Sequence, residues 1–428
     1  MDIFKDFNVT RYEGQLKNGI KIVLFHRHGA PITTRAILKS GSRYDPSFAP
    51  GIAHFIEHMI VNGSPEFPSK DLLAECIESV GGFFEAATGQ EYMIVYTEIS
   101  EKEDFTRAID VFNATLCRPL MDKKVFENEK NVVIKEIKKG NSEPVKILQK
   151  TSQKLFFKDT VFEHLGLGDE ESISNLNYAD VVAHHKKLFD RSRITFVASG
   201  DISLEELTSK LDTISFLEGN EFNQVEESHQ TTNQKNILSE LFDAPQTYIY
   251  FGVYSPRSYT KESIHLNLLG QILAGGRASR LTKRLRYKKG LIYGIGFSRN
   301  GGIDFGSWGI STNTSEDKVQ EVVNEIIEEI NNIQKNGVKE AELEFVKNKR
   351  IKSLKRTMQT SNDWVDFHAV AEVFVNETYN INTFVTDTEN TTIEDIKYVI
   401  NKYLGSAKWK LAMCGRTKEE SILINFDE

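Results

Sequence analysis

The sequence contains little cysteine and no long hydrophobic run. Three of its 428 residues are cysteine, namely Cys76, Cys117 and Cys414. Three widely spaced cysteines provide neither a disulfide framework nor a cysteine-rich zinc knuckle, and they favour a reducing compartment. The apolar stretches are far shorter than the roughly 20 residues that a membrane-spanning helix needs. We therefore expect no disulfide bonds and no membrane span.

An excess of positive charge is also absent. Lysine and arginine total 53, aspartate and glutamate total 61, and the formal net charge is −8. This balance argues against nucleic acid or an anionic membrane as the main partner. The N-terminal stretch Met1–Asp6 is charged. It has neither the apolar core of a signal peptide nor the arginine-rich, acid-poor character of a transit peptide, so we expect a cytoplasmic protein.

The secondary structure expected along the chain repeats once. Strand-like runs at Lys21–Phe25 and Gln246–Val253 begin the two halves, helical stretches follow, and strand-like runs at Ile194–Ser199 and Trp409–Gly415 end them. A chain of this length is expected to form two domains or more. We predict the α+β class, with two homologous domains that each contain a mostly antiparallel sheet with helices packed on one side.

A polar stretch with few apolar side chains separates the two halves and is typical of a linker. We therefore predict an N-terminal domain at residues 1–217, a polar linker at 218–243 and a C-terminal domain at 244–428. The chemical motifs lie in both predicted domains.

The stretch Gly51–Met59 is the most informative motif. It places His54 and His58 four residues apart, with Glu57 just before the second histidine. On a helix, these spacings bring the three side chains to one face. A catalytic zinc takes neutral imidazole ligands and keeps one position open for water, which a neighbouring carboxylate deprotonates. The order His-x-x-Glu-His is the inverzincin signature.

The alternative interpretation of this motif is a surface helix with two solvated histidines. Apolar residues at Ile52, Phe55, Ile56 and Met59 argue against it, because they predict a core helix. Buried imidazoles and carboxylates need partners. The pattern therefore favours a metal site.

A third ligand must come from another segment, and Phe126–Ile137 offers candidates. This stretch predicts a helix, and Glu129 and Glu136 lie seven positions apart on it. Seven positions are two turns, so the two carboxylates project from nearly the same side. Neighbouring lysines support a second interpretation, a charged and solvated helix face. The spacing alone leaves both open.

Together these motifs resemble the pitrilysin/insulinase family of zinc peptidases. In that family, a second helix with a liganding glutamate follows the His-x-x-Glu-His helix after a gap like the 78 positions between His58 and Glu136. The resemblance implies that His54, His58 and Glu136 bind one zinc ion per chain. It also implies that Glu57 is the catalytic general base and that Glu129 is a carboxylate supporting the site.

The stretch Gly81–Thr88 resembles the edge strand with which such enzymes bind substrate, and this implies that Glu85 and Ala86 contact the substrate. The family typically has asparagine where this chain has Glu85. A carboxylate accepts hydrogen bonds but cannot donate them as an amide does. It could favour substrates with a basic residue beside the cut. A specialised maturation enzyme, weak general proteolysis and neutral drift in a solvated strand fit it as well.

The second half carries an independent signal at Arg286 and Tyr293, seven positions apart. The resemblance implies that this pair contacts the substrate carbonyl next to the scissile bond. A cation and a phenol can both donate hydrogen bonds to a developing oxyanion. Without the first half, a basic surface helix with one packed tyrosine would be the better interpretation.

The length of the chain implies a dimer. Long family members carry four such domains around a chamber, whereas this chain supplies two. In shorter members, two chains pair, and the Arg-Tyr pair of one chain meets the zinc site of the other. The resemblance to mitochondrial processing peptidase subunits and bacterial homologues therefore implies half of a clam-shell chamber, completed in a homodimer or in a heterodimer with a related chain.

The function expected from this resemblance is that of a zinc-dependent endopeptidase acting on peptides or unfolded segments in an enclosed chamber. General peptide turnover and processing of a precursor peptide both fit. The alternative is a non-catalytic scaffold or partner subunit of the same fold in a heterodimeric peptidase. The intact set His54, Glu57, His58 and Glu136 argues against that alternative.

Overall fold

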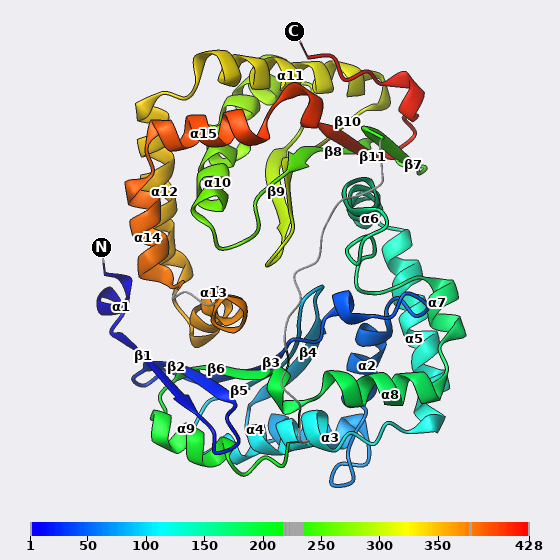
Figure 1. The fold of residues 1–428 in the computed structure, drawn as a ribbon, viewed down its shortest axis with the longest axis vertical. Helices are drawn as coiled ribbons and strands as arrows, with labels where there is room; N and C mark the ends of the chain where they lie inside the picture. The colour runs from blue at the N-terminus through cyan, green and yellow to red at the C-terminus, as the bar shows by residue number, and fades with distance from the viewer. Residues whose placement is uncertain (1, 217–218, 220–221, 223–234, 376–378, 427–428) are drawn as a thin grey trace. The chain divides into compact units, whose positions relative to one another are not determined.

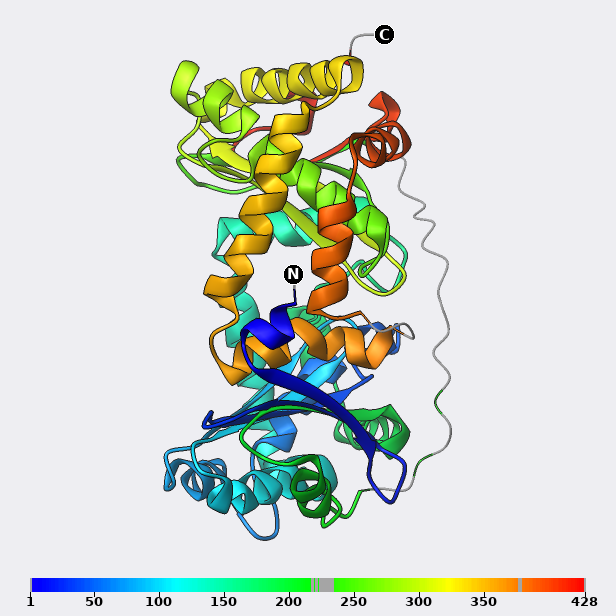
Figure 2. The same cartoon turned by 90° about the vertical axis from the view of Figure 1, so that its left-hand side faces the viewer.

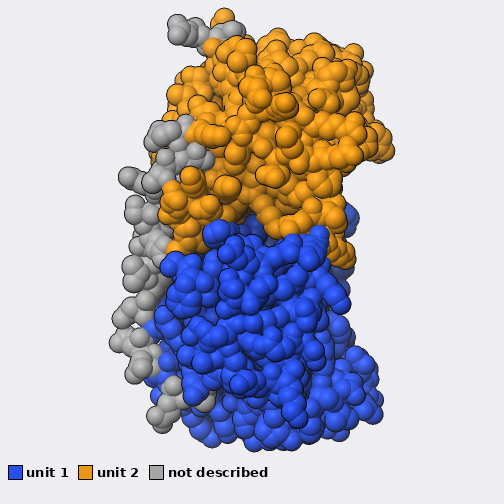
Figure 3. Space-filling model, turned by 90° about the vertical axis from the view of Figure 1, so that its right-hand side faces the viewer, with its two compact units in different colours: residues 1–138, 164–225, 355–383 blue, residues 139–163, 226–354, 384–428 orange. Residues whose placement is uncertain are grey.

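The computed structural model describes residues 2–216, 219, 222, 235–375 and 379–426. The chain forms two compact units (Figure 3). Each unit contains one β-sheet. Unit 1 comprises residues 1–138, 164–225 and 355–383, and unit 2 comprises residues 139–163, 226–354 and 384–428. The combination of sheets and helices confirms the predicted α+β class.

Unit 1 contains a six-stranded sheet in the order β1-β2-β6-β3-β5-β4 (Figure 1). Its strands are β1 (Val9–Gln15), β2 (Lys21–Arg27), β3 (Ile32–Leu38), β4 (Phe83–Thr88), β5 (Met93–Ile99) and β6 (Ile194–Gly200). Neighbouring strands are antiparallel except β2 and β6, which are parallel. Because β4 is the last strand in the order, one side of its backbone is not paired within the sheet.

One face of this sheet packs into the main hydrophobic core of unit 1. Alternation along β5 directs Met93 and Val95 into that core, while Ile94 and Tyr96 face the other side. The helices of unit 1 are α1 (Ile3–Asp6), α2 (Ile52–Ile60), α3 (Lys70–Glu78), α4 (Phe105–Phe112), α5 (Lys123–Asn141), α7 (Glu170–Asn175), α8 (Tyr178–Leu188), α9 (Leu204–Leu211) and α13 (Ser361–Phe374). Helices α2, α4 and α8 contribute apolar side chains to this core.

Helix α13 packs on the other face of the same sheet, across β2, β6 and β3 (Figures 1 and 2). Phe25 of β2 stacks on His368 of α13, with ring centroids 4.3 Å apart. Trp364, one turn earlier on α13, is fully buried beside them. The aromatic contact shows why a helix from the C-terminal half of the sequence lies on this sheet.

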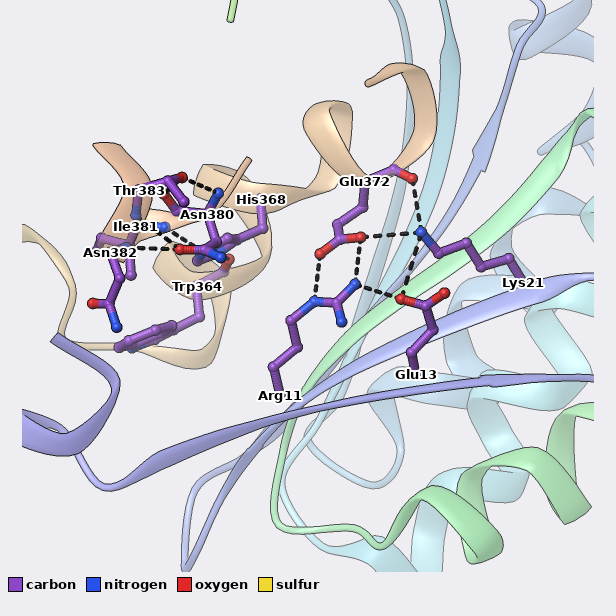
Figure 4. A network of polar contacts seen from close by, with 10 residues as sticks. All are labelled: Arg11, Glu13, Lys21, Trp364, His368, Glu372, Asn380, Ile381, Asn382 and Thr383. Carbon is purple, nitrogen blue, oxygen red and sulfur yellow. Dashed lines mark hydrogen bonds and ion pairs between the residues drawn. The ribbon is translucent and has the colours of Figure 1, made fainter. Parts of the chain in front are cut away.

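Polar contacts also fix α13 (Figure 4). Glu372 accepts a 2.7 Å hydrogen bond from Nε of Arg11 and lies 3.1 Å from Nζ of Lys21. His368 accepts a 3.2 Å hydrogen bond at Nε2 from the backbone N–H of Ile381. Its Nδ1 therefore carries the proton and donates to the carbonyl oxygen of Trp364 at 2.8 Å. The imidazole of His368 is neutral in this arrangement.

Unit 2 contains a five-stranded sheet in the order β7-β11-β8-β10-β9. Its strands are β7 (Ile237–Leu241), β8 (Thr247–Tyr254), β9 (Ile295–Gly301), β10 (Gly306–Thr314) and β11 (Lys410–Gly415). Neighbouring strands are antiparallel except β7 and β11, which are parallel. Its helices are α6 (Pro144–Phe157), α10 (Lys261–Ala274), α11 (Val319–Asn336), α12 (Glu340–Thr357), α14 (Ile381–Asn390) and α15 (Ile393–Tyr403).

Helix α6 packs on β11, β7 and β8 of unit 2, although it comes from the N-terminal half of the sequence. Phe156 of α6 meets Tyr250 of β8 with ring centroids 5.8 Å apart, in a cluster with Ala412 and Cys414 of β11. Helix α10 packs on β9 and β10. Each half of the sequence thus lends one helix to the sheet of the other half.

The domain prediction divided the chain at a single linker, and it did not include the exchange of α6 and α13 between the two halves. Strand β7 also lies inside the predicted linker 218–243, where no strand was expected. The rest of that segment at 218, 220–221 and 223–234 lies outside the described residues.

Short helical turns complete the described chain. They are η1 (Ser42–Tyr44), η2 (Lys102–Asp104), η3 (Asn113–Cys117), η4 (Arg191–Arg193), η5 (Thr282–Lys288), η6 (Glu316–Lys318), η7 (Ser406–Lys408) and η8 (Glu419–Ser421), of which η3 and η5 are π-helical. In the described part of the chain, no helix combines the length and the apolar character needed to cross a membrane.

Candidate active site

Helix α2 begins at a turn that only glycine fits. Gly51 has a left-handed φ of 89°, and a Cβ there would lie 2.6 Å from the carbonyl oxygen of Leu167. The carboxylate of Asp45 caps the helix from outside, accepting hydrogen bonds from the backbone N–H groups of Gly51 (2.7 Å) and Ala53 (3.1 Å). Burial raises the pKa of Asp45 to about 7, and these two hydrogen bonds act in the opposite direction.

The apolar residues of α2 are buried, and its three polar residues lie together. The imidazole centroids of His54 and His58 are 4.8 Å apart, and potential ligand atoms of His54, Glu57 and His58 all lie within 4.8 Å of one another. His54 is buried, and the other two are half-buried. The spacing read from the sequence thus produces one compact group of side chains.

Helix α5 adds two carboxylates to this group, those of Glu129 and Glu136. Oε2 of Glu136 lies 3.8 Å from Nε2 of His54 and 3.6 Å from Nε2 of His58. Two ligand atoms bound at 2.0–2.1 Å to a tetrahedral zinc are about 3.3 Å apart. The two distances from Glu136 are thus slightly longer than those in a zinc ligand set, and 46% of the Glu136 side chain remains exposed.

Glu129 approaches His58 from the opposite side of the ring. Its Oε2 lies 3.1 Å from Nδ1 of His58, so a proton on Nδ1 leaves Nε2 free to face Glu136. Burial lowers the pKa of His58, but this hydrogen bond and the nearby carboxylates outweigh it and raise the pKa overall. Burial raises the pKa of Glu129, but the hydrogen bond to His58, the charge of that ring and the contributions of Asn62 and Lys70 together outweigh it, and the net shift is downward. Glu129 thus orients His58 rather than completing the ligand set.

The imidazole of His54 is neutral. Burial, with the nearby His58, lowers the pKa of His54 to about 3. Nδ1 of His54 is buried and has no hydrogen-bond partner among the described residues. A neutral imidazole is the form that binds metal ions, and two imidazole rings beside a carboxylate are chemically suited to zinc.

Glu57 has a partner on the edge strand. Thr88, at the end of β4, donates a 2.6 Å hydrogen bond from Oγ1 to Oε2 of Glu57. Burial raises the pKa of Glu57 to about 7, with the Thr88 hydrogen bond acting against it. The contact holds the Glu57 carboxylate between the histidines and the edge strand.

The two edge-strand candidates face opposite sides of β4. Ala86 packs against the hydrophobic core, whereas the side chain of Glu85 is exposed and accepts a 2.6 Å hydrogen bond from the hydroxyl group of Tyr96. Only the backbone of Ala86 is thus available at the sheet edge, while Glu85 also presents its carboxylate.

Arg286 and Tyr293 lie in unit 2 and contact each other. The guanidinium carbon of Arg286 is 4.9 Å from the centroid of the Tyr293 ring, which is within cation–π range, and Tyr293 is 80% exposed. Ion pairs hold the neighbouring Arg284 and Lys289 on Glu325 of α11. The predicted site residues thus form two separate sets. The histidine–carboxylate group forms within unit 1, and the Arg-Tyr pair forms within unit 2.

Two family models match successive parts of the chain. The model described as "Insulinase (Peptidase family M16)" matches residues 22–166, and the model described as "Peptidase M16 inactive domain" matches residues 175–350. The chain belongs to peptidase family M16, the insulinase family. The predicted family resemblance is thus confirmed, and the histidine–carboxylate group lies within the first matched region.

Relatives agree with membership of family M16. A protein named "Uncharacterized zinc protease" from Rickettsia bellii is 26% identical over 347 residues, which covers 79% of this chain and 81% of that protein. Mitochondrial-processing peptidase subunit beta from Bos taurus is 26% identical over 192 residues, 45% of this chain and 39% of that protein. The solved structure of a peptidase M16 inactive domain from Pseudomonas fluorescens has a TM-score of 0.87 at 20% identity, covering 97% of this chain and 100% of that one.

Sequence reasoning missed three residues of this M16 site. Nothing in the sequence indicated that Asp45 bonds to Gly51, or that Thr88, at the end of the stretch Gly81–Thr88, bonds to Glu57. Tyr96 gave no signal, because its contact with Glu85 depends on the register of β4 and β5. These contacts become visible only when the packing of the elements is known.

Proposed function

We propose that this M16 protein is a zinc-dependent endopeptidase that hydrolyses peptides or unfolded segments. One observation carries the proposal: Nε2 of His54 and Nε2 of His58 both face Oε2 of Glu136, at 3.8 and 3.6 Å, with Glu57 beside them. In the proposal, His54, His58 and Glu136 hold one zinc ion per chain. The name zinc protease carried by a relative supports this metal.

Zinc held by these residues supplies a Lewis acid that polarises a peptide carbonyl and lowers the pKa of a water molecule. Glu57 takes a proton from the attacking water on its carboxylate as the water oxygen bonds to the carbonyl carbon. Glu57 then passes that proton to the amine nitrogen as the C–N bond breaks. Thr88 keeps the Glu57 carboxylate aimed at this position. Glu129 holds the tautomer and orientation of His58.

The edge strand β4 indicates which class of substrate the proposed enzyme cleaves. The unpaired side of β4 offers backbone N–H and C=O groups to an extended peptide, which can add to the sheet as a further strand. Thr88 connects this edge directly to Glu57. An extended chain can pair in this way, and a folded domain with its backbone groups already paired cannot.

Arg286 and Tyr293 are proposed to donate hydrogen bonds to the oxygen of the substrate carbonyl as negative charge develops on it. We propose that the pair acts on the zinc site of a second chain in a homodimer or a heterodimer with a related chain. The likeness to a protein named as a subunit, mitochondrial-processing peptidase subunit beta, supports this arrangement. The cytoplasmic location stays a prediction.

The second candidate is a non-catalytic subunit of the same fold. The description of one matching family model as an inactive domain favours it for the second half of the chain, residues 175–350. The histidine–carboxylate group lies outside that region, and Glu136 lies close to zinc-ligand distance from both imidazoles, so we favour the enzyme.

A digest of a mixed peptide library separates the two candidates. The protein is incubated with the library before and after treatment with a chelator, and zinc is then restored. The enzyme predicts cleavage that the chelator abolishes and zinc recovers. The Glu57→Gln variant serves as the matched control for contaminating proteases. Cleavage that persists unchanged in the chelator or in this variant contradicts the proposal.

A further inference from the structure

Glu85 presents an ordered carboxylate on the edge strand. It lies directly opposite Tyr96 in the pairing of β4 with β5, and Tyr96 lies opposite Arg35 in the pairing of β5 with β3. The Tyr96 hydroxyl group donates a 2.6 Å hydrogen bond to Oε2 of Glu85. Burial and the bond to Glu85 raise the pKa of Tyr96 to about 12, so the phenol remains a donor near neutral pH. The Glu85 carboxylate accepts this one hydrogen bond, and most of its oxygen lone pairs remain free to accept others.

No cation of the described residues neutralises Glu85. The candidate on the same face is Arg35, whose guanidinium lies over the Tyr96 ring, 5.2 Å from the centroid. Arg35 is already engaged by α13, because it donates a 2.6 Å hydrogen bond to Asn362 and forms an ion pair with Asp366. Among the described residues Glu85 forms no ion pair, and its side chain is exposed. The structure thus holds a fixed negative charge with an open position for a cation.

The position of Glu85 relative to Glu57 defines where that cation would sit. Thr88, which holds Glu57, is three residues from Glu85 on the same strand. Strand residues advance about 3.3 Å each, so the two positions are about 10 Å apart along β4. An extended peptide paired with β4 advances by the same step. Its side chain next to Glu85 therefore lies about two to four residues from the bond that Glu57 helps to cleave.

We infer that Glu85 is a specificity-determining residue that selects peptides carrying arginine or lysine two to four residues from the scissile bond. The inference rests on the proposed endopeptidase function. A charge-assisted hydrogen bond between a guanidinium or ammonium group and a carboxylate is about twice as strong as a neutral one. Tyr96 holds the carboxylate in place, which reduces the entropy lost when the cation binds. The core-facing residues of β4, Phe84 and Ala86, carry no charge that could take this role.

The test uses quenched peptides of one sequence in which arginine is placed at each position from four residues before to four residues after the cut. Each is compared with a peptide carrying citrulline, which has nearly the shape of arginine but no charge. For the wild-type protein we expect kcat/KM about tenfold higher for arginine at one or two positions. Glu85→Gln should reduce this ratio to near one. Glu85→Lys should instead favour a glutamate peptide.

Two variants distinguish selection from a general structural effect. Tyr96→Phe keeps the ring but removes the donor, so the ratio should fall part of the way. Glu98→Gln changes a carboxylate on the same face of β5, opposite Phe83 rather than Glu85, and should leave the ratio unchanged. An arginine-to-citrulline ratio equal in the wild type and in Glu85→Gln overturns the inference.

Failure of the inference differs from failure of the proposed function. If all peptides are cleaved equally, and only with Glu57 intact, the protein is an endopeptidase and Glu85 does not select. Binding is measured separately in the Glu57→Gln protein, by fluorescence anisotropy of the arginine and citrulline peptides. A binding preference for arginine that disappears on adding Glu85→Gln supports the inference without any turnover. Equal binding of the two peptides contradicts it.

Discussion

Thr88 Oγ1 donates a 2.6 Å hydrogen bond to Oε2 of Glu57, joining the edge strand β4 to the helix α2 that carries both histidines. A hydrogen bond to a charged group contributes about 1.5–3 kcal/mol. Thr88→Val keeps the shape but removes the donor, and we expect kcat/KM to fall about tenfold as the carboxylate loses its fixed position. Zinc content should not change. Thr88→Ser keeps the hydroxyl group and is the control, and equal rates in the two variants would show that the contact has no catalytic role.

Glu129 should determine zinc affinity without being a ligand. Its 3.1 Å contact with Nδ1 of His58 orients the ring, and loss of such a partner typically lowers metal affinity by about 10–100-fold. We expect this loss in Glu129→Gln, measured by competition with a chromophoric chelator. Glu127→Gln alters an exposed carboxylate on the same helix and should have no effect. A normal zinc affinity in Glu129→Gln would contradict the role.

His368 should make stability depend on pH. Burial lowers its pKa to about 4, whereas an unfolded histidine has a pKa near 6.5. Between these values the unfolded chain binds more protons than the folded one, so stability is present above about pH 6.5 and falls as the pH drops toward 4. From pH 7 to 5 the loss from this residue is about 2 kcal/mol.

The measurement is the melting temperature at pH 7 and at pH 5. His368→Gln should be less stable at pH 7, because it loses the packing on Phe25, but its melting temperature should fall less between the two pH values. His184 and His185 also have a pKa near 4 owing to burial, so part of the pH dependence should remain. An identical fall in wild type and variant would show that His368 is not the neutral, buried acceptor of the Ile381 N–H group.

The proposed dimer predicts complementation between two inactive variants. Glu57→Gln lacks the base, and Tyr293→Phe lacks the phenol that acts on the other chain. At an equal ratio with random exchange, up to about half of the dimers are mixed, and each mixed dimer contains one intact site. Activity of the mixture should rise well above that of either variant alone. A monomer in solution that cleaves peptides at full rate would contradict the arrangement in trans.

The sequence predicted the local elements well, because their signals are local. Lys21–Phe25, Ile194–Ser199 and Trp409–Gly415 show runs of strand-forming residues, and each forms a strand. The exchange of α6 and α13 could not be predicted in this way. Their apolar residues indicate a buried face without indicating which sheet covers it. Strand β7 was missed because it is short and partly exposed, in a region of polar composition.

The same distinction between local spacing and contacts between elements applies to the candidate site. Helical spacing alone predicted that His54, Glu57 and His58 share a face, and the family resemblance added Glu136 and Glu129. Thr88 and Tyr96 could not be found, because their contacts depend on the packing of β4 against α2 and on its pairing with β5. Spacing within one element is thus readable from the sequence, whereas contacts between elements require the fold.

The most direct test of the proposed function measures zinc content and turnover together in Glu57→Gln. The variant keeps the size and hydrogen bonding of the side chain but removes the base. If His54, His58 and Glu136 are the ligands, about one zinc per chain should remain while kcat falls by roughly 10²-fold or more. Loss of the zinc would instead make Glu57, which also lies within ligand distance of both histidines, the third ligand. Near-normal turnover with zinc retained would contradict the catalytic role of Glu57 and with it the proposed function.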